Sequence, residues 1–483
     1  MTPTPLDMIG QDASPEAGTL LLRLVADFLG ASAAGAGAVS PPTDPAELAR
    51  RFEEALPRAG RSLESVVARL RDDVAGESIR LSHPMYLGHQ VSAPLPAAIW
   101  TEPLIAAINN SIAVREMSPA GTIVEARVIR WMCDLAGFGD TAGGTFTSGG
   151  TEATFTALLA ARAALLPDAW EEGVGPRPPV IVSGEHAHYA VTRAAGELGL
   201  GVRRAVAVPS RDFRMDVDAL RSTLDRLARE GQAVMAVVAT AGSTATGSFD
   251  DLEAIAELTG ERGIWLHVDG AHGASALLSA RHAERLRGIE GAHSIAWDPH
   301  KMMLVPLSAG MVLVRNERDL ELAFAQRAPY LFHATDGRIT DQGTRSFQCS
   351  RRFDALKVWV ALERYGADAI GALYDRLCNR AETLHRLVAD HPLFEAIHEP
   401  ESNILCFRYL PEGIEGEALD ELNRRVREAY NRSGEGWITT TMLDGRRVLR
   451  VTVMNPRTEV EHLERLLHGL ARTGARLLAG DHA

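Results

Sequence analysis

The segment AWDPHKMMLVP, residues 296–306, sets a lysine between two apolar runs. Its beginning has the pattern of a short buried strand that stops at Pro299, and Lys301 is followed at once by further apolar residues. A lysine enclosed by apolar side chains holds its proton less firmly than one in water, and its free amine can act as a nucleophile. Because most lysines are simply solvated, Lys301 needs chemical partners before it indicates a site.

An anion site is predicted where the segment TFTSGGTEATFTALL passes from a strand into a helix. Gly149 and Gly150 let backbone N–H groups approach a ligand, Thr151 adds a hydroxyl, and a helix N-terminus favours negative charge. A plain strand-to-helix turn is the alternative, because glycine turns are common. The segment has no GKS or GKT, so it is not a nucleotide-binding P-loop.

A buried acid is predicted at the end of the strand in IWLHVDGAHGA, where Asp269 precedes Gly270 and Ala271. A buried carboxylate needs a cation or strong hydrogen-bond donors. It could equally form a structural ion pair or a helix cap. His267, Asp269 and His272 could also be metal ligands, but no matching ligands stand out elsewhere, so we predict no metal.

His188 begins a predicted helix in SGEHAHYAVTRAAGELGLG, again after a strand. Its imidazole could stack on a flat ligand, although a lone histidine there is more often structural. These four segments indicate a binding site more strongly together than any one of them does alone, because ligands bind at the carboxyl ends of strands in open α/β sheets. A lysine amine, a buried acid, a phosphate cradle and a ring stacker are the parts that pyridoxal 5′-phosphate requires.

The elements that must position these residues form an α/β pattern. From about residue 100, short apolar runs alternate with helical stretches. The predicted strands are Gly144–Thr147, Val180–Val182, Ala233–Ala239, Ile264–Val268, Ser294–Trp297 and Ala309–Val314. Continuous apolar runs between helices predict a mainly parallel sheet with helices on both faces.

Three regions are predicted. Residues 1–95 carry amphipathic helices, with start signals at Ser14 and Asp44 but little core, and read as a dimerisation segment. Residues 96–350 form the large α/β domain, and residues 351–483 form a small α+β domain. The small domain begins with a long helix at 353–364, and its Asp444-Gly445 pair is typical of a tight hairpin turn.

Composition narrows the class of protein. The 483 residues carry a net charge of −13 with mixed signs, which argues against a nucleic-acid surface. The four cysteines are far apart, which disfavours disulfides or a zinc site and favours a reducing cytoplasm. The N-terminus lacks the pattern of a signal peptide, and prolines interrupt the longest uncharged stretches, so no membrane span is expected.

The motif DPHKMM, with HVDGAHG upstream of it, resembles the fold-type I pyridoxal-phosphate decarboxylases of group II, and the likeness runs from about residue 83 to residue 456. This family includes glutamate, aromatic amino acid, cysteine sulfinate and 2,4-diaminobutyrate decarboxylases. The resemblance implies decarboxylation of an L-amino acid through a Schiff base and a quinonoid intermediate, in a homodimer with shared active sites.

The resemblance also implies roles for individual residues. Lys301 would form the Schiff base, Asp269 would hold the pyridine nitrogen, and His188 and Ala271 would lie on opposite faces of the ring. The full set of implied cofactor contacts is Gly149, Gly150, Thr151, His188, Thr244, Asp269, Ala271, Ser294, His300, Lys301 and Ser350.

For the substrate, Arg450 in VLRVTVMNP would bind a carboxylate and Gln90 in MYLGHQVS would line the pocket. Tyr330 in APYLFHATDG would protonate Cα, although it could be an ordinary loop aromatic. Two positions depart from the family pattern. Asp298 stands where asparagine is frequent, and Ser350 stands where glutamate decarboxylases usually have glycine.

An acidic or diamino acid substrate is favoured. The alternatives are decarboxylation-coupled oxidative deamination, β-elimination on a substituted amino acid, an aminotransferase, and a catalytically silent binding protein with this fold. The presence of Tyr330 favours plain decarboxylation among these.

Overall fold

The computed structural model describes residues 5–324 and 341–480. The chain divides into two compact units, and each is described by itself. The larger consists of Gln90–Glu382 and His398–Leu405, and the smaller of Met1–His89, Thr383–Ile397 and Cys406–Ala483. Residues 351–382, which the sequence led us to group with the small domain, therefore belong to the larger unit.

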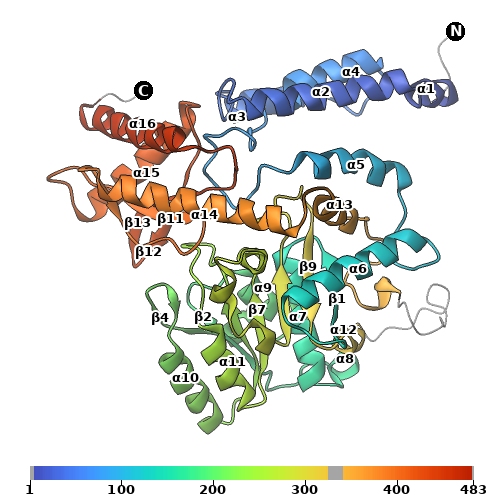
Figure 1. Ribbon diagram of the computed structural model, residues 1–483, viewed down its shortest axis with the longest axis vertical. Coiled ribbons are helices and arrows are strands. Elements are labelled where there is room, and N and C mark those ends of the chain that lie inside the picture. Colours follow the sequence, from blue (N-terminus) through green and yellow to red (C-terminus); the bar gives the residue numbers. More distant parts are fainter. Residues whose placement is uncertain (1–4, 325–340, 481–483) are drawn as a thin grey trace. The chain divides into compact units, whose positions relative to one another are not determined.

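A seven-stranded sheet organises the larger unit (Figure 1). Its order is β1 (Gly143–Thr147), β9 (Gly310–Val314), β8 (Ser294–Trp297), β7 (Trp265–Asp269), β6 (Val234–Thr240), β2 (Val180–Gly184) and β3 (Ala205–Val208). β9 runs antiparallel to β1 and β8, and the other neighbours pair in parallel. The six predicted strands are confirmed, and the sequence reading missed β3 and the short hairpin of β4 (Ser210–Arg211) and β5 (Arg214–Met215).

Helices cover both faces of this sheet, as predicted. The helices of the larger unit are α5 (Pro96–Ile108), α6 (Pro119–Leu135), α7 (Gly150–Leu165), α8 (Ala169–Glu172), α9 (Ala190–Glu197), α10 (Val217–Arg229), α11 (Leu252–Gly260), α12 (Arg318–Ala323), α13 (Ala355–Tyr365) and α14 (Ala367–Ala389), which contains the boundary between the units. α7 packs closely because Ala153 and Ala157 meet Ala271 and Ala296 in one buried cluster. This close packing brings the start of α7 to the carboxyl edge of the sheet.

The smaller unit joins the two ends of the chain. Its helices are α1 (Pro5–Asp12), α2 (Pro15–Ala33), α3 (Pro45–Arg51), α4 (Leu63–Arg69) with a π-helical turn at Leu70–Ala75, α15 (Gly416–Arg432) and α16 (Val460–Leu478). Its sheet has the order β10 (Phe394–Ala396), β11 (Ile404–Tyr409), β13 (Arg446–Thr452) and β12 (Thr439–Leu443). Among the described residues, no helix is long and apolar enough to cross a bilayer.

Local signals in the smaller unit act as the sequence indicates. The Ser14 hydroxyl accepts the N–H of Ala17, and the Asp44 carboxylate accepts the N–H of Ala46, so both cap their helices. Asp444 and Gly445 both have positive φ, 49° and 72°, which the tight hairpin between β12 and β13 requires. That turn sets the register that pairs Thr439 with Arg450.

Candidate active site

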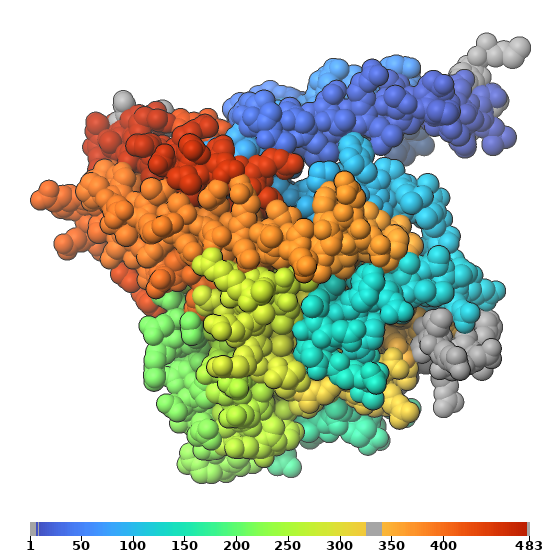
Figure 2. Space-filling view, viewed as in Figure 1, coloured from blue at the N-terminus to red at the C-terminus, as the bar shows by residue number. Residues whose placement is uncertain are grey.

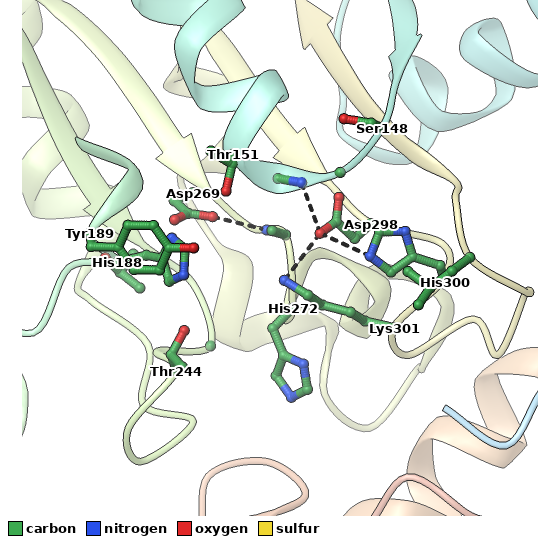
Figure 3. A pocket seen from close by; sticks show the side chains of 16 residues that line it. Ser148, Thr151, His188, Tyr189, Thr244, Asp269, His272, Asp298, His300 and Lys301 are labelled. Carbon is green, nitrogen blue, oxygen red and sulfur yellow. Dashed lines mark hydrogen bonds and ion pairs between the residues drawn. The ribbon is translucent and has the colours of Figure 1, made fainter. Parts of the chain in front are cut away.

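A cavity of about 350 Å³ opens at the carboxyl edge of the larger unit's sheet (Figure 3). Strand ends build it, because Thr240 ends β6, Asp269 ends β7 and Asp298 follows β8. The predicted residues that line it are Gly149, Gly150, Thr151, His188, Thr244, Asp269, Ala271, His300 and Lys301. Residues far apart in sequence therefore share one cavity, as the strand-end argument predicts.

The predicted anion-binding turn lies at the start of α7. The backbone N–H and hydroxyl of Ser148 both donate to Glu152, at 2.9 and 2.6 Å, which fixes the turn on the helix. A Cβ placed on Gly150 would lie 2.7 Å from the Cβ of Ala271, so only glycine lets the turn come this close. The Gly150 N–H donates to Oδ2 of Asp298 at 3.0 Å. A helix N-terminus, a hydroxyl at Thr151 and His300 thus face one end of the cavity.

Lys301 differs from its sequence-based expectation. Instead of lying among apolar walls, its Nζ is 3.0 Å from Oδ2 of Asp298, and its side chain is 21% exposed. The tight turn that holds it places the Lys301 N–H 2.9 Å from the carbonyl of Asp298. The apolar residues that follow, Met302 to Val305, point into the core and not around the amine.

Only two lysines occur in the whole sequence, Lys301 and Lys357. Lys357 is fully buried, and its Nζ binds Asp354 at 2.9 Å, Glu102 at 3.2 Å and the carbonyl of Ser308 at 2.6 Å. Lys301 is therefore the one lysine amine in the described chain that faces a cavity.

The middle of the cavity suits a flat polar ring. Asp269 is 8% exposed, and one of its oxygens accepts the N–H of Ala271 at 3.2 Å. His188 and Tyr189 lie beside it, with ring centroids 4.1 Å apart (Figure 3). The N–H of Ala190 donates to Nδ1 of His188, so a neutral ring carries its proton on Nε2. Burial lowers the pKa of His188, which favours this neutral form for stacking.

A buried histidine lies on the same strand as Asp269. His267, two residues earlier on β7, is fully buried, and its Nδ1 lies 2.9 Å from the hydroxyl of Ser294. Burial lowers the pKa of His267 to about 4, although Asp269 acts in the opposite direction. This imidazole is therefore neutral at pH 7. Within the described residues, no three His, Cys, Asp or Glu side chains are grouped so as to hold a metal ion.

Several residues at the cavity were not singled out from the sequence. They are Tyr189, Thr240, Gly242 and Leu307. Asp298 was noticed only as a departure from a family pattern, and His272 was considered only as a metal ligand. The spacing of Asp298 and Lys301, three residues apart in a turn, could have indicated their pairing. His272 is oriented by Asn403, whose side-chain oxygen lies 2.7 Å from its Nε2. No short-range signal connects residues so far apart.

Ser294, one of the cofactor contacts that the family resemblance implies, does not line the cavity. It is fully buried, and its hydroxyl accepts the indole N–H of Trp265 at 2.9 Å. In the parallel pairing of β7 and β8, Ser294 stands opposite His267, whereas Asp269 stands opposite Ala296. Ser294 thus lies toward the amino end of its strand, away from the edge where the cavity opens.

Three other predicted residues do not line the cavity, and a fourth lies outside the described chain. Ser350 is exposed, and Gln90 is partly buried with no hydrogen-bond partner for its Nε2 among the described residues. Arg450 belongs to the smaller unit, on β13. Tyr330 is the residue that lies outside the described ranges.

An open α/β sheet with a lysine amine, a buried strand-end carboxylate, a stacking imidazole and a glycine-lined helix N-terminus around one cavity defines the class of pyridoxal-phosphate enzymes. The family model described as "Pyridoxal-dependent decarboxylase conserved domain" matches residues 45–410. The chain belongs to this family.

Similar proteins and a similar solved structure support this family assignment. An L-2,4-diaminobutyrate decarboxylase of Rhizobium meliloti strain 1021 is 34% identical over 433 residues, covering 89% of this chain and 85% of that protein. An acidic amino acid decarboxylase of Mus musculus is 33% identical, covering 77% of this chain and 68% of that protein. The solved glutamate decarboxylase domain of a diaminobutyrate-pyruvate transaminase and L-2,4-diaminobutyrate decarboxylase from Vibrio parahaemolyticus has a TM-score of 0.86 at 29% identity, covering 99% and 98% of the two chains.

The protein is therefore a pyridoxal 5′-phosphate-dependent amino acid decarboxylase. The cavity fits the cofactor, because a lysine amine, a buried carboxylate, an imidazole and a glycine turn at a helix N-terminus all line it. When bound, the cofactor supplies an electron sink for the pair of electrons that CO2 leaves behind.

Proposed function

We propose that the substrate is a short L-amino acid with a charged side chain, either diamino or acidic, and that the product is the corresponding amine. The observation that carries the proposal is the lining of the cavity. Apart from Tyr189 and Leu307, the side chains that line it are small, polar or charged. An aromatic substrate would lack the apolar wall that it needs. Relatives named for diaminobutyrate and for acidic amino acids support the same class.

Within this proposal, Lys301 holds the cofactor through its amine and Asp269 keeps a proton on the pyridine nitrogen. Gly149, Gly150, Thr151 and His300 bind the phosphate. His188 and Ala271 enclose the ring, and Thr244 lies near its oxygen. The support is that all of these residues line one cavity. Gln90 and Ser350 keep the pocket roles that the family resemblance implies.

Arg450 is proposed to bind the substrate carboxylate. Its side chain is 6% exposed, and its Nη1 donates only weakly, at 3.3 Å, to the hydroxyl of Thr439. Neither its Nε nor its Nη2 has a hydrogen-bond partner within the described residues. A buried guanidinium with unused donors is costly unless an anion pairs with it, and a carboxylate matches its fork geometry.

The substrate and product are tested together. The purified holoenzyme is offered a panel of L-amino acids, including 2,4-diaminobutyrate, aspartate, glutamate, cysteine sulfinate and tryptophan, while CO2 is measured and products are identified by mass spectrometry. A kcat/KM for tryptophan above that for every short charged substrate contradicts the substrate proposal. An aldehyde or a keto acid as main product contradicts amine release, and for Tyr330→Phe we expect more aldehyde and less amine.

We also propose a homodimer located in the cytoplasm. Large apolar side chains are exposed on α1 and α2, helices drawn in blue in Figure 2. They are Leu6, Ile9, Leu21, Leu22 and Val25. A second subunit would bury such a surface. Sedimentation equilibrium should give twice the 52.1 kDa chain mass, and a monomer at micromolar concentration would contradict the proposal.

A further inference from the structure

A backbone N–H, a lysine ammonium and an imidazole surround a single carboxylate oxygen at the start of α7. Oδ2 of Asp298 accepts the N–H of Gly150 at 3.0 Å and lies 3.0 Å from Nζ of Lys301. Nε2 of His300 lies 3.5 Å from the same oxygen. The N–H of Ala309 donates to Nδ1 of His300, so the neutral imidazole carries its hydrogen on Nε2, facing Asp298. Figure 3 shows these groups around the carboxylate.

The carboxylate is firmly built into this position. Its side chain is 2% exposed, and its other oxygen, Oδ1, is buried without a hydrogen-bond partner within the described residues. Two glycines leave the room that it fills. A Cβ on Gly150 would lie 3.1 Å from Oδ2, and a Cβ on Gly310 would lie 2.8 Å from Oδ1.

We propose that the Asp298 carboxylate holds the phosphate-binding donors in place and lowers the affinity of the site for the cofactor phosphate. A phosphate at the start of α7 must compete with Asp298 for the N–H of Gly150, which the carboxylate already accepts, and for His300, whose Nε2 faces the same oxygen. Two anions held close together in a partly dry site also repel each other. Asp298 is thus a positioning residue, and it sets how easily the cofactor leaves. The inference rests on the cofactor roles proposed above for Gly150 and His300.

The substitution Asp298→Asn tests the charge with little change of shape. The amide keeps an oxygen for the N–H of Gly150 and adds an N–H that can donate to phosphate, while the repulsion disappears. Affinity for a phosphate-bearing ligand should therefore rise by about tenfold. Affinity for the same ring without its phosphate should not change.

The experiment uses the full chain stripped of cofactor, as wild type and as Asp298→Asn. Isothermal titration calorimetry measures binding of pyridoxine 5′-phosphate and of pyridoxine, neither of which has an aldehyde to react with Lys301. We expect Asp298→Asn to bind pyridoxine 5′-phosphate about tenfold more tightly, with pyridoxine unchanged. Failure of the Lys301 assignment would leave this result intact, because no covalent bond is involved.

Two controls keep the test decisive. Asp354→Asn removes one negative charge beside Lys357 in the same unit, outside the cavity lining, and should leave both affinities unchanged. Asp298→Ser removes the charge without an amide, and it should also tighten binding of pyridoxine 5′-phosphate if the asparagine variant fails to fold. Equal or weaker binding of pyridoxine 5′-phosphate by both folded Asp298 variants overturns the proposal. An equal gain for both ligands overturns it too, because the effect would then not act through phosphate.

Discussion

Nζ of Lys301 lies 3.0 Å from Oδ2 of Asp298, so the amine expected among apolar side chains is ion-paired with a carboxylate three residues earlier. The amine must leave this pair before it can attack an aldehyde, because a nucleophile needs its lone pair free. The pair also ties the lysine to the N-terminus of α7, since Gly150 donates to the same oxygen. The amine that we propose attacks the cofactor and the turn that we propose binds its phosphate are therefore linked through one side chain.

Lys301→Ala should abolish decarboxylation by several orders of magnitude, because no other lysine faces the cavity. The scarcity of lysine offers a direct assay. A lysine-specific protease can cut the unfolded chain only after Lys301 and Lys357. After borohydride reduction of the holoenzyme, cleavage at Lys301 should be blocked while cleavage at Lys357 continues as an internal control. Full cleavage at both sites would refute the assignment.

Asp269→Asn should lower kcat by about 10²–10³-fold, because the charge that supports the pyridine nitrogen is lost. Asp269→Glu keeps the charge but shifts it by one methylene, and it should retain more activity. Cofactor absorbance and far-UV circular dichroism check that both variants still bind and fold. A similar loss in the two variants would indicate that position, and not charge, is what matters.

Stability should fall in acid partly through His267. In the folded protein the pKa of His267 is lowered from 6.5 to about 4. Between these two pH values the imidazole is protonated in the unfolded state but not in the folded state. The free energy of unfolding should therefore drop by about 1.4 kcal/mol per pH unit between about pH 6 and pH 4 from this residue. Urea titrations of His267→Asn should show a flatter fall, whereas the exposed His468→Asn should keep the wild-type slope.

Arg450→Gln should lower kcat/KM by about 100-fold, since hydrogen bonds to a charged group contribute roughly 1.5–3 kcal/mol each. Arg446, exposed on the same strand, gives a matched control, and Arg446→Gln should behave as wild type. Steady-state kinetics with the best substrate of the panel measure both. An unchanged kcat/KM in Arg450→Gln would remove this residue from substrate binding.

Lys357→Met should lower the free energy of unfolding by about 1–3 kcal/mol, because it removes a fully buried ammonium that pairs with Asp354 and Glu102. The loss is limited because Arg352 stays paired with both carboxylates. The ammonium also holds the carbonyls of Pro306 and Ser308, which flank Leu307 at the cavity. Chemical denaturation measures the loss. The double variant Lys357→Met with Asp354→Asn should recover part of it, and no recovery would argue against a charge effect.

Much of the fold follows from patterns that are local in the chain. Continuous apolar runs between helices predicted six of the strands, and the Asp444-Gly445 pair predicted the hairpin, because these features depend on neighbouring residues alone. β3 was not predicted because it is a short edge strand of which only Val208 is buried, so no continuous buried run marks it.

The sequence by itself determined many of the residues that belong to the site, whereas the tertiary structure decided how they pair. Strand-end position was enough to predict Asp269, Lys301, His188 and the turn at Gly150, because carboxyl ends of parallel strands share an edge. Which side chain pairs with which depended on strand register and helix packing. Because of the strand register, Ser294 lies away from the cavity. Because α7 packs closely on the sheet, the N–H of Gly150 donates a hydrogen bond to Asp298. The Gly150–Asp298 contact joins residues 148 positions apart, over which no local pattern extends.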